Sequence, residues 1–119
     1  MLPLGFASAI LPHKSLQEVL DFAQEKNFDC VEVMCWPTEN QDTRRYAGVS
    51  HISVDTLSDS ELNTLKFKLA AHPTKVSALG YYPNPMDPDP IKAAFYREHI
   101  KKIIRAAAAL EIPVVNTFI

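Results

Sequence analysis

The stretch SLQEVLDFAQEKNFDCVEVM, residues 15–34, decides the fold of this chain. Its first half predicts a helix, because Ser15 and Glu18 have the spacing of a capping box. The apolar residues that follow share one helical stripe: Leu16, Val19, Leu20 and Ala23. Asn27 then closes the helix, since asparagine tolerates left-handed backbone. The nearly all-apolar run Cys30–Met34 is typical of a strand covered on both faces, as in a parallel sheet.

The same alternation of helix and strand continues along the chain. A second capping box at Ser58 and Glu61 opens a helix that His72-Pro73 ends. Asp89 caps a third helix, with Pro90 at its first position. The other strands are expected at 4–8, 76–82 and 114–119. The buried side of the third helix is predicted to consist of Ile91, Ala94, Phe95, Ile103, Ala107 and Leu110.

Three strand–helix pairs followed by a strand predict a parallel sheet with right-handed crossovers. The links from strand to helix are long and carry most of the unusual residues, which places function at the carboxyl ends of the strands. The chain has three glycines and no glycine-rich loop follows the first strand, where Gly5 stands alone, which disfavours a dinucleotide or Walker loop. We therefore expect an α/β fold: a parallel (βα)3β unit, the N-terminal half of a TIM (β/α)8 barrel. Residues 1–119 form this single partial domain, whereas a complete barrel typically needs about 250 residues.

Composition narrows the function classes. The chain is 47% hydrophobic and 22% charged, with a formal net charge of -2, so it lacks the basic balance of nucleic-acid binders. No run approaches the roughly 18 apolar residues of a membrane span, and the first residues carry no basic leader. A cytoplasmic protein is expected. Cys30 and Cys35 are five apart, on opposite faces of a shared strand, and are interpreted as reduced apolar fillers.

The segment Asn27-Phe28-Asp29-Cys30-Val31-Glu32-Val33 resembles the second strand, G-F-D-x-V-E, of the sugar phosphate isomerase/epimerase group, the xylose isomerase-like TIM barrels. RYAGVSHI at 45–52 and VNTFI at 115–119 look like the loop after strand two and the end of strand four in one branch. Asn27 stands where the family usually has glycine. The resemblance implies a barrel with a divalent metal (Mn, Mg, Co or Zn) that isomerises or epimerises a sugar or sugar phosphate by proton transfer next to a carbonyl.

The metal ligands that the resemblance implies come from later strands and map onto no residue of this chain. The chain alone is therefore expected to bind no metal and to be inactive. One alternative is a non-catalytic assembly module: four parallel strands leave two open edges, through which two copies can pair as a homodimer. The abasic-site endonuclease branch ranks lower, because the strand ends Gly80-Tyr81-Tyr82 and Thr117-Phe118-Ile119 lack its histidines.

Glu32 is the candidate catalytic residue, because a charge in an apolar strand is costly unless it is paired. It is either a substrate-contacting carboxylate or a structural ion pair. The aromatic residues at strand ends either wall a sugar pocket or plug the core. They are Trp36, Tyr81, Tyr82 and Phe118, with Trp36 and Tyr81 as the first candidates for a pocket role.

Polar residues near the same strand ends complete the candidate set. Asn84 and Thr117 can bond sugar hydroxyls, and Arg44 and Arg45 can hold a phosphate or be merely solvated. The histidines have no assigned role. His13 and His51 are expected to be solvated loop residues, His72 a helix end and His99 a helix-surface residue: none of them suggests a metal site.

Overall fold

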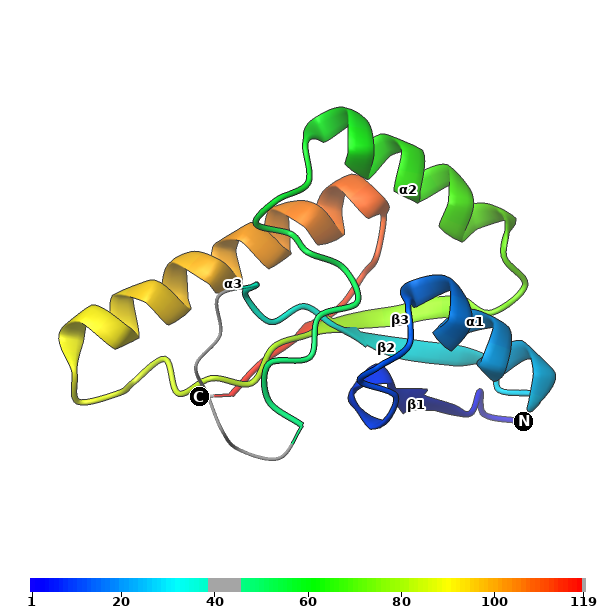
Figure 1. The fold of residues 1–119 in the computed structure, drawn as a ribbon, viewed down its shortest axis with the longest axis horizontal. Helices are drawn as coiled ribbons and strands as arrows, with labels where there is room; N and C mark the ends of the chain where they lie inside the picture. Colours follow the sequence, from blue (N-terminus) through cyan, green and yellow to red (C-terminus); the bar gives the residue numbers. More distant parts are fainter. Residues whose placement is uncertain (39–45, 119) are drawn as a thin grey trace.

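The computed structural model describes residues 1–38 and 46–118, and within them strands and helices alternate as predicted (Figure 1). A short 3-10 helix, η1 (Ser8–Ile10), follows the first strand. The remaining elements, in chain order, are β1 (Gly5–Ala7), α1 (Leu16–Glu25), β2 (Cys30–Met34), α2 (Asp59–Ala71), β3 (Lys75–Gly80), α3 (Pro90–Leu110) and β4 (Val115–Asn116).

The predicted helix starts are confirmed by their side-chain caps. The Ser15 hydroxyl accepts from the Glu18 amide at 3.2 Å, and the Glu18 carboxylate accepts from the Ser15 amide at 2.7 Å. Ser58 and Glu61 repeat the pair with the same two distances. Each box satisfies two amides that have no partner inside the helix. Local sequence therefore determines where α1 and α2 begin.

The four strands form one parallel sheet in the order β1-β2-β3-β4. Because every crossover moves one strand further in the same direction, right-handed connections place all three helices on one face of the sheet (Figure 1). Val31, Val33 and Leu79 point to that face and are fully buried. The result is an α/β, parallel (βα)3β unit, as in half of a TIM barrel.

The opposite face of the sheet is open and carries the candidate site. Paired residues show which side chains lie there. Ala7 is opposite Glu32, and Gly80 pairs with both Met34 and Asn116. In a closed barrel this face is the interior. The open face thus holds the one charged residue of β2, Glu32, among small and apolar neighbours.

A bulge in β3 changes which of its residues reach the open face. Val31 pairs with Val76, but Glu32 pairs with Ala78, so Ser77 has no partner of its own. An extra residue in one strand reverses the in–out alternation of everything after it. Strict alternation from Val76 would turn Ala78 and Gly80 toward the helices. With the bulge, both lie on the open face instead.

The start of α3 differs from the prediction. Ile91, Ala94 and Phe95 were expected on the buried side but are exposed, because the first turns of α3 extend past the sheet (Figure 1). The predicted burial of the later turns is correct. Buried side chains in α3 are Ala93, His99, Ile103, Ala106, Ala107 and Leu110.

The structure also describes the two cysteines and the length and polarity of the helices. Cys30 and Cys35 are both free thiols, and burial raises the pKa of the Cys35 thiol, which keeps it unreactive. Among the described residues, no helix is both long enough and apolar enough to cross a bilayer.

Candidate functional site

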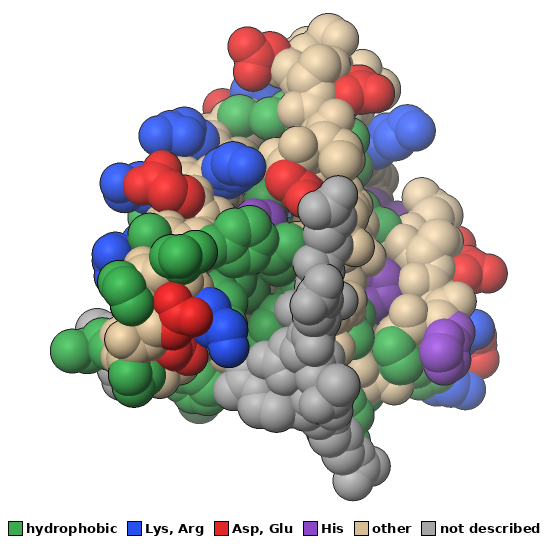
Figure 2. All heavy atoms as spheres, turned by 60° about the vertical axis from the view of Figure 1, so that its left-hand side comes forward, with side chains coloured by type: hydrophobic (Ala, Val, Ile, Leu, Met, Phe, Trp, Pro, Cys, Tyr) green, Lys and Arg blue, Asp and Glu red, His purple; other side chains and the backbone are tan. Residues whose placement is uncertain are grey.

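A cavity of about 390 Å³ opens at the carboxyl ends of the strands. Its lining combines β1, β2 and the segments that follow β2, β3 and β4, and comprises Ala7, Ala9, Met34, Trp36, Tyr46, Ala47, Tyr82 and Phe118. Figure 2 brings this end of the molecule forward and shows hydrophobic side chains gathered on it. A mostly apolar concave site with a few polar groups at its margin is the usual form of a small-molecule pocket.

The Glu32 carboxylate is not itself a lining residue, but it is hydrogen-bonded to Tyr82, which lines the cavity. The Tyr82 hydroxyl donates to Glu32 Oε1, and Asn116 Nδ2 donates to the same oxygen at 3.1 Å. Within the part of the chain that the structure describes, no hydrogen bond reaches Oε2 and no basic side chain pairs with Glu32. Two neutral donors thus hold one carboxylate oxygen and leave the other available to a ligand hydroxyl.

Gly80 makes room for this arrangement. A Cβ on Gly80 would lie 2.5 Å from Glu32 Oε1 and 2.5 Å from Met34 Cε. Real Cβ atoms do not approach other heavy atoms so closely, so any side chain at this position would displace the Glu32 carboxylate. Glycine is required at this position because the side chains of Glu32 and Met34 occupy the space that a Cβ would need.

Tyr82 links the carboxylate to the apolar wall. Burial and then the hydrogen bond to Glu32 raise the pKa of the Tyr82 phenol, so the hydroxyl stays protonated at neutral pH and acts as a donor. The Tyr82 ring packs against Phe118, with 5.1 Å between ring centroids. Phe118 is about half exposed and lines the cavity with Tyr82, and its role in sugar binding stays a prediction.

The structure gives Trp36 and Tyr81 different environments. Trp36 lines the cavity, but the Tyr81 side chain is 1% exposed and packs in the core between Trp36, at 4.9 Å, and His99, at 4.8 Å between ring centroids. Tyr82 occupies the site instead. The β3 bulge is the reason, because it turns Tyr81 to the helices and Tyr82 to the open face.

The polar candidates from the later loops lie outside the cavity lining. Asn84 is exposed, and its Oδ1 accepts from the Met86 amide at 3.1 Å, so this side chain shapes the turn before α3. Thr117 follows Asn116 and by alternation faces the other way; its buried Oγ1 has no hydrogen-bond partner in residues 1–38 and 46–118. Arg44 and Arg45, the predicted phosphate ligands, lie outside the described residues.

Sequence reasoning missed Asn116 and ranked Tyr82 behind Trp36 and Tyr81 among the aromatic residues at strand ends. A signal for Asn116 was available: it stands two residues before Phe118 and therefore shares its face of the strand. No sequence signal favoured Tyr82 over Tyr81, because the bulge that turns Tyr82 toward Glu32 is set by the pairing of β2 with β3.

Two histidines differ from their predicted environments. His99 was expected on a helix surface but is 3% exposed, and its Nε2 donates to the Cys35 carbonyl at 2.7 Å. His51 was expected to be solvated but is half-buried, with Nδ1 2.8 Å from Ser8 Oγ and Nε2 3.1 Å from the Leu11 carbonyl. Burial lowers the pKa of both rings, which favours neutral histidine. Both are structural anchors for the chain around β2.

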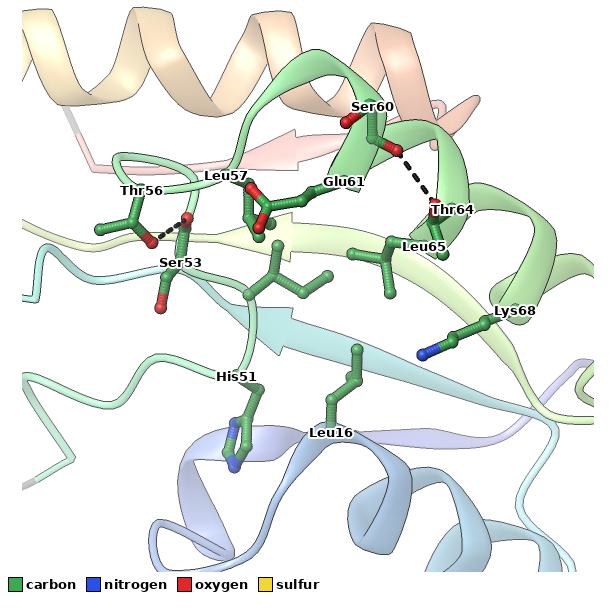
Figure 3. A pocket seen from close by; sticks show the side chains of 11 residues that line it. Leu16, His51, Ser53, Thr56, Leu57, Ser60, Glu61, Thr64, Leu65 and Lys68 are labelled. Atoms are coloured by element: carbon green, nitrogen blue, oxygen red, sulfur yellow. Dashed lines mark hydrogen bonds between the residues drawn. The ribbon is translucent and has the colours of Figure 1, made fainter.

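A second, larger cavity of about 520 Å³ lies on the helix side between α1 and α2 (Figure 3). Two of its hydroxyl groups are used internally: Thr56 donates to the Ser53 carbonyl and Thr64 to the Ser60 carbonyl. Its floor is apolar and includes Leu16, Leu57 and Leu65. Size and polar lining favour this cavity, whereas the position at the carboxyl ends of the strands favours the smaller cavity next to Tyr82 and Glu32.

The donor set at the candidate site does not fit a divalent metal. Among the residues that the structure describes, no group of three or more His, Cys, Asp and Glu side chains converges. Around Glu32 the other polar groups are a protonated phenol and an amide nitrogen, which donate hydrogen bonds instead of lone pairs. One carboxylate does not make the multi-ligand shell that such cations require.

These features define a parallel α/β protein of the half-barrel type, with its candidate site at the carboxyl ends of the strands. The sequence profile of the xylose isomerase-like TIM barrel family matches residues 20–119, and the chain belongs to this family. No curated protein matches the sequence. The predicted family and fold class are thereby confirmed.

Proposed function

We propose that this chain is the sugar-binding half of a sugar or sugar phosphate isomerase/epimerase-like barrel. The observation that carries the proposal is the Glu32 carboxylate, which Tyr82 and Asn116 hold through Oε1 at the edge of an apolar cavity. A carboxylate oxygen that accepts no hydrogen bond from the described residues, such as Glu32 Oε2, is a strong acceptor for hydroxyl groups. The family, the position at the strand ends and the cavity support a small polyhydroxylated ligand.

Each part of the site has a distinct task in this proposal. Glu32 Oε2 accepts a hydroxyl of the sugar, while Tyr82 and Asn116 fix the orientation of the carboxylate. Trp36 and Phe118 contact the apolar face of the sugar ring, as aromatic walls do in such pockets. Arg44 and Arg45 remain the predicted partners of a phosphate group.

The chemistry of the proposed complete enzyme is proton transfer next to a carbonyl. Members of this family are often metal-dependent, but the described residues of this chain do not form such a site. We therefore assign no proton-transfer step to them. The 119-residue chain is expected to bind a sugar without converting it.

Trp36 provides the assay, because it is the single tryptophan of the sequence and lines the cavity. Ketoses, aldoses and their phosphates are titrated while its fluorescence is recorded. Glu32→Gln should weaken binding about 10- to 100-fold, the range for one charge-assisted hydrogen bond. Glu98→Gln is the matched control, because Glu98 is an exposed carboxylate on α3 paired with Lys101, and its affinity should equal that of the wild type.

Two results would contradict the proposal. Either no sugar changes the Trp36 fluorescence at millimolar concentration, or Glu32→Gln binds as tightly as the wild type. The inactivity of the chain is tested separately by assaying isomerisation and epimerisation with Mn, Mg, Co and Zn salts. Robust turnover by the purified chain would show that the described half contains the catalytic groups after all.

A further inference from the structure

The larger cavity, of about 520 Å³, is formed by α1, α2 and the segment between β2 and α2 (Figure 3). Its floor consists of four apolar side chains: Leu16, Ile52, Leu57 and Leu65. It lies on the helix side of the sheet, whereas the cavity next to Tyr82 lies at the open face. Its volume is within the range of small-molecule pockets, so it can hold a ligand without competing with the candidate sugar site.

A side-chain contact fixes the two helices at the end away from this cavity. His72 Nε2, at the carboxyl end of α2, lies 3.0 Å from Asp21 Oδ1 of α1. His72 Nδ1 accepts from the Thr74 amide at 3.0 Å, so Nε2 carries the proton and donates to Asp21. The cavity lies nearer the starts of the same helices, where Leu16 and residues 60–68 line it. The space between α1 and α2 is therefore preformed.

Lys68 places an ammonium group at one end of the cavity. Figure 3 shows its side chain extending from α2 toward the space between Leu65 and Leu16. Within residues 1–38 and 46–118, Lys68 makes no ion pair, whereas Lys66 of the same helix pairs with Glu111 at 3.0 Å. An unpaired ammonium group next to an apolar floor favours a ligand that carries an anionic group on a hydrocarbon body.

The carboxylate that lines the cavity, Glu61, is already engaged in the helix cap. Its Oε2 accepts from the Ser58 amide at 2.7 Å, and this bond lowers the pKa of the Glu61 carboxyl, so the group is charged at neutral pH. Lys68 follows Glu61 by two helical turns, which is about 10 Å along the helix axis. A negative ligand group is therefore repelled at Glu61 and attracted at Lys68, so a bound carboxylate has one preferred orientation.

We propose that this cavity binds a small carboxylate with an apolar body, such as a medium-chain fatty acid. The carboxylate pairs with Lys68, and the hydrocarbon chain covers the apolar floor. A polyhydroxylated ligand fits this cavity less well, because the Thr56 and Thr64 hydroxyls already donate to backbone carbonyls. The site is thus distinct from the proposed sugar site in both position and ligand chemistry.

Hexanoate is the probe, and the methyl signals of the four floor residues in NMR spectra report its binding. We expect a dissociation constant in the millimolar range. Each methylene added between butanoate and octanoate should strengthen binding by up to about fourfold, because the chain is buried on the floor. 1-Hexanol, which has the same chain without the charge, should bind about two- to fivefold more weakly than hexanoate. Inorganic phosphate should shift none of the four residues' signals.

Lys68→Gln removes the cation and should weaken hexanoate binding about two- to fivefold, the range for an exposed ion pair, with no effect on 1-hexanol. Lys92→Gln is the matched control, because Lys92 is exposed on α3 and does not line the cavity, so its hexanoate affinity should equal that of the wild type. Leu65→Phe places a larger side chain in the cavity and should weaken the binding of both ligands. Cooperative thermal unfolding verifies that each variant is folded.

The proposal is overturned if hexanoate leaves the four floor residues' signals unchanged at tens of millimolar, or if butanoate and octanoate bind equally well. Equal hexanoate affinities for Lys68→Gln and Lys92→Gln would also overturn it, because Lys68 would then not hold the carboxylate. Unchanged binding by Leu65→Phe would place the ligand outside this cavity. Lys68→Gln should leave the sugar titration of Trp36 unchanged, so a failure of either proposal is distinguished from a failure of the other.

Discussion

Gly80→Ala is expected to displace the Glu32 carboxylate while the strands of the sheet stay paired. The new Cβ would lie 2.5 Å from both Glu32 Oε1 and Met34 Cε, which are the ends of flexible side chains. The strands can therefore stay paired while the Glu32 carboxylate moves. Moving it breaks the bonds from Tyr82 and Asn116, so the site loses its fixed acceptor although the sheet survives.

The magnitudes differ for binding and for stability. Loss of the oriented carboxylate should weaken sugar binding about 10- to 100-fold, as one charge-assisted hydrogen bond is worth about 1.5–3 kcal/mol. Repacking of Met34 should lower the free energy of unfolding by about 1–3 kcal/mol, the usual cost of an added methyl group in a packed region. Gly5→Ala is the contrasting variant, because its Cβ would meet the Cys30 carbonyl oxygen at 2.4 Å. A backbone atom cannot move away as the end of a side chain can. Gly5→Ala should therefore lower the free energy of unfolding more than Gly80→Ala.

Chemical denaturation and Trp36 fluorescence titration measure the two effects. The side-chain amide signal of Asn116 in NMR spectra reports the Glu32 contact without any ligand, and Gly80→Ala should shift it. The reasoning is refuted if Gly80→Ala leaves the Asn116 signal and the sugar affinity unchanged. It is also refuted if Gly80→Ala destabilises the protein more than Gly5→Ala, since the contact at Gly80 would then be the more rigid one.

Three further predictions concern stability. Ser58→Ala removes one half of a capping box and should lower the free energy of unfolding by about 1 kcal/mol, measured by urea titration with Ser60→Ala as the comparison. Ile103→Ala empties a fully buried position and should cost about 2–5 kcal/mol; a smaller loss would show that α3 packs loosely on the sheet. Because burial lowers the pKa of His99 and His51 in the folded protein, the unfolded chain binds more protons below about pH 6.5. Stability should therefore fall as the pH drops from 6.5 to 5, by at most about 1.4 kcal/mol per pH unit for His99 and by less for the half-buried His51. His99→Gln should flatten this dependence, and an unchanged slope would mean that His99 is protonated in the folded state.

The helix and strand order was predictable because its signals are local. Ser15, Ser58 and Asp89 each bond to amides within three residues, so the sequence places the starts of α1, α2 and α3 correctly. The strand β2 was predicted with its observed bounds, Cys30–Met34, because an apolar run between turn residues is also a local pattern. The shorter β4 shows the limit, since strand length depends on the partner strand.

The candidate site was predictable only in part. Glu32 stood out as a charge within an apolar strand, and Phe118 as an aromatic residue at a strand end. Their partners depend on the register between strands. One extra residue in β3 exchanges the roles of Tyr81 and Tyr82, and sequence alternation within β3 gives no sign of it.

The burial of His99 also depends on tertiary contacts. Its helical position is compatible with solvent or with the core, and the side chain is buried because the Cys35 carbonyl and the Tyr81 ring lie opposite it. The first turns of α3 show the converse, since Ile91 and Phe95 have the apolar pattern of a core but no sheet beneath them.

The amino-acid sequence by itself determined the α/β class, the parallel order of the elements and the family, because caps, hydrophobic period and chain order are properties of neighbouring residues. Only the tertiary structure decided which side chains meet at Glu32. That choice rests on the β2–β3 bulge and on the pairing of Gly80 with Asn116, contacts between residues far apart in the chain. Long-range register is the physical quantity that local pattern does not encode.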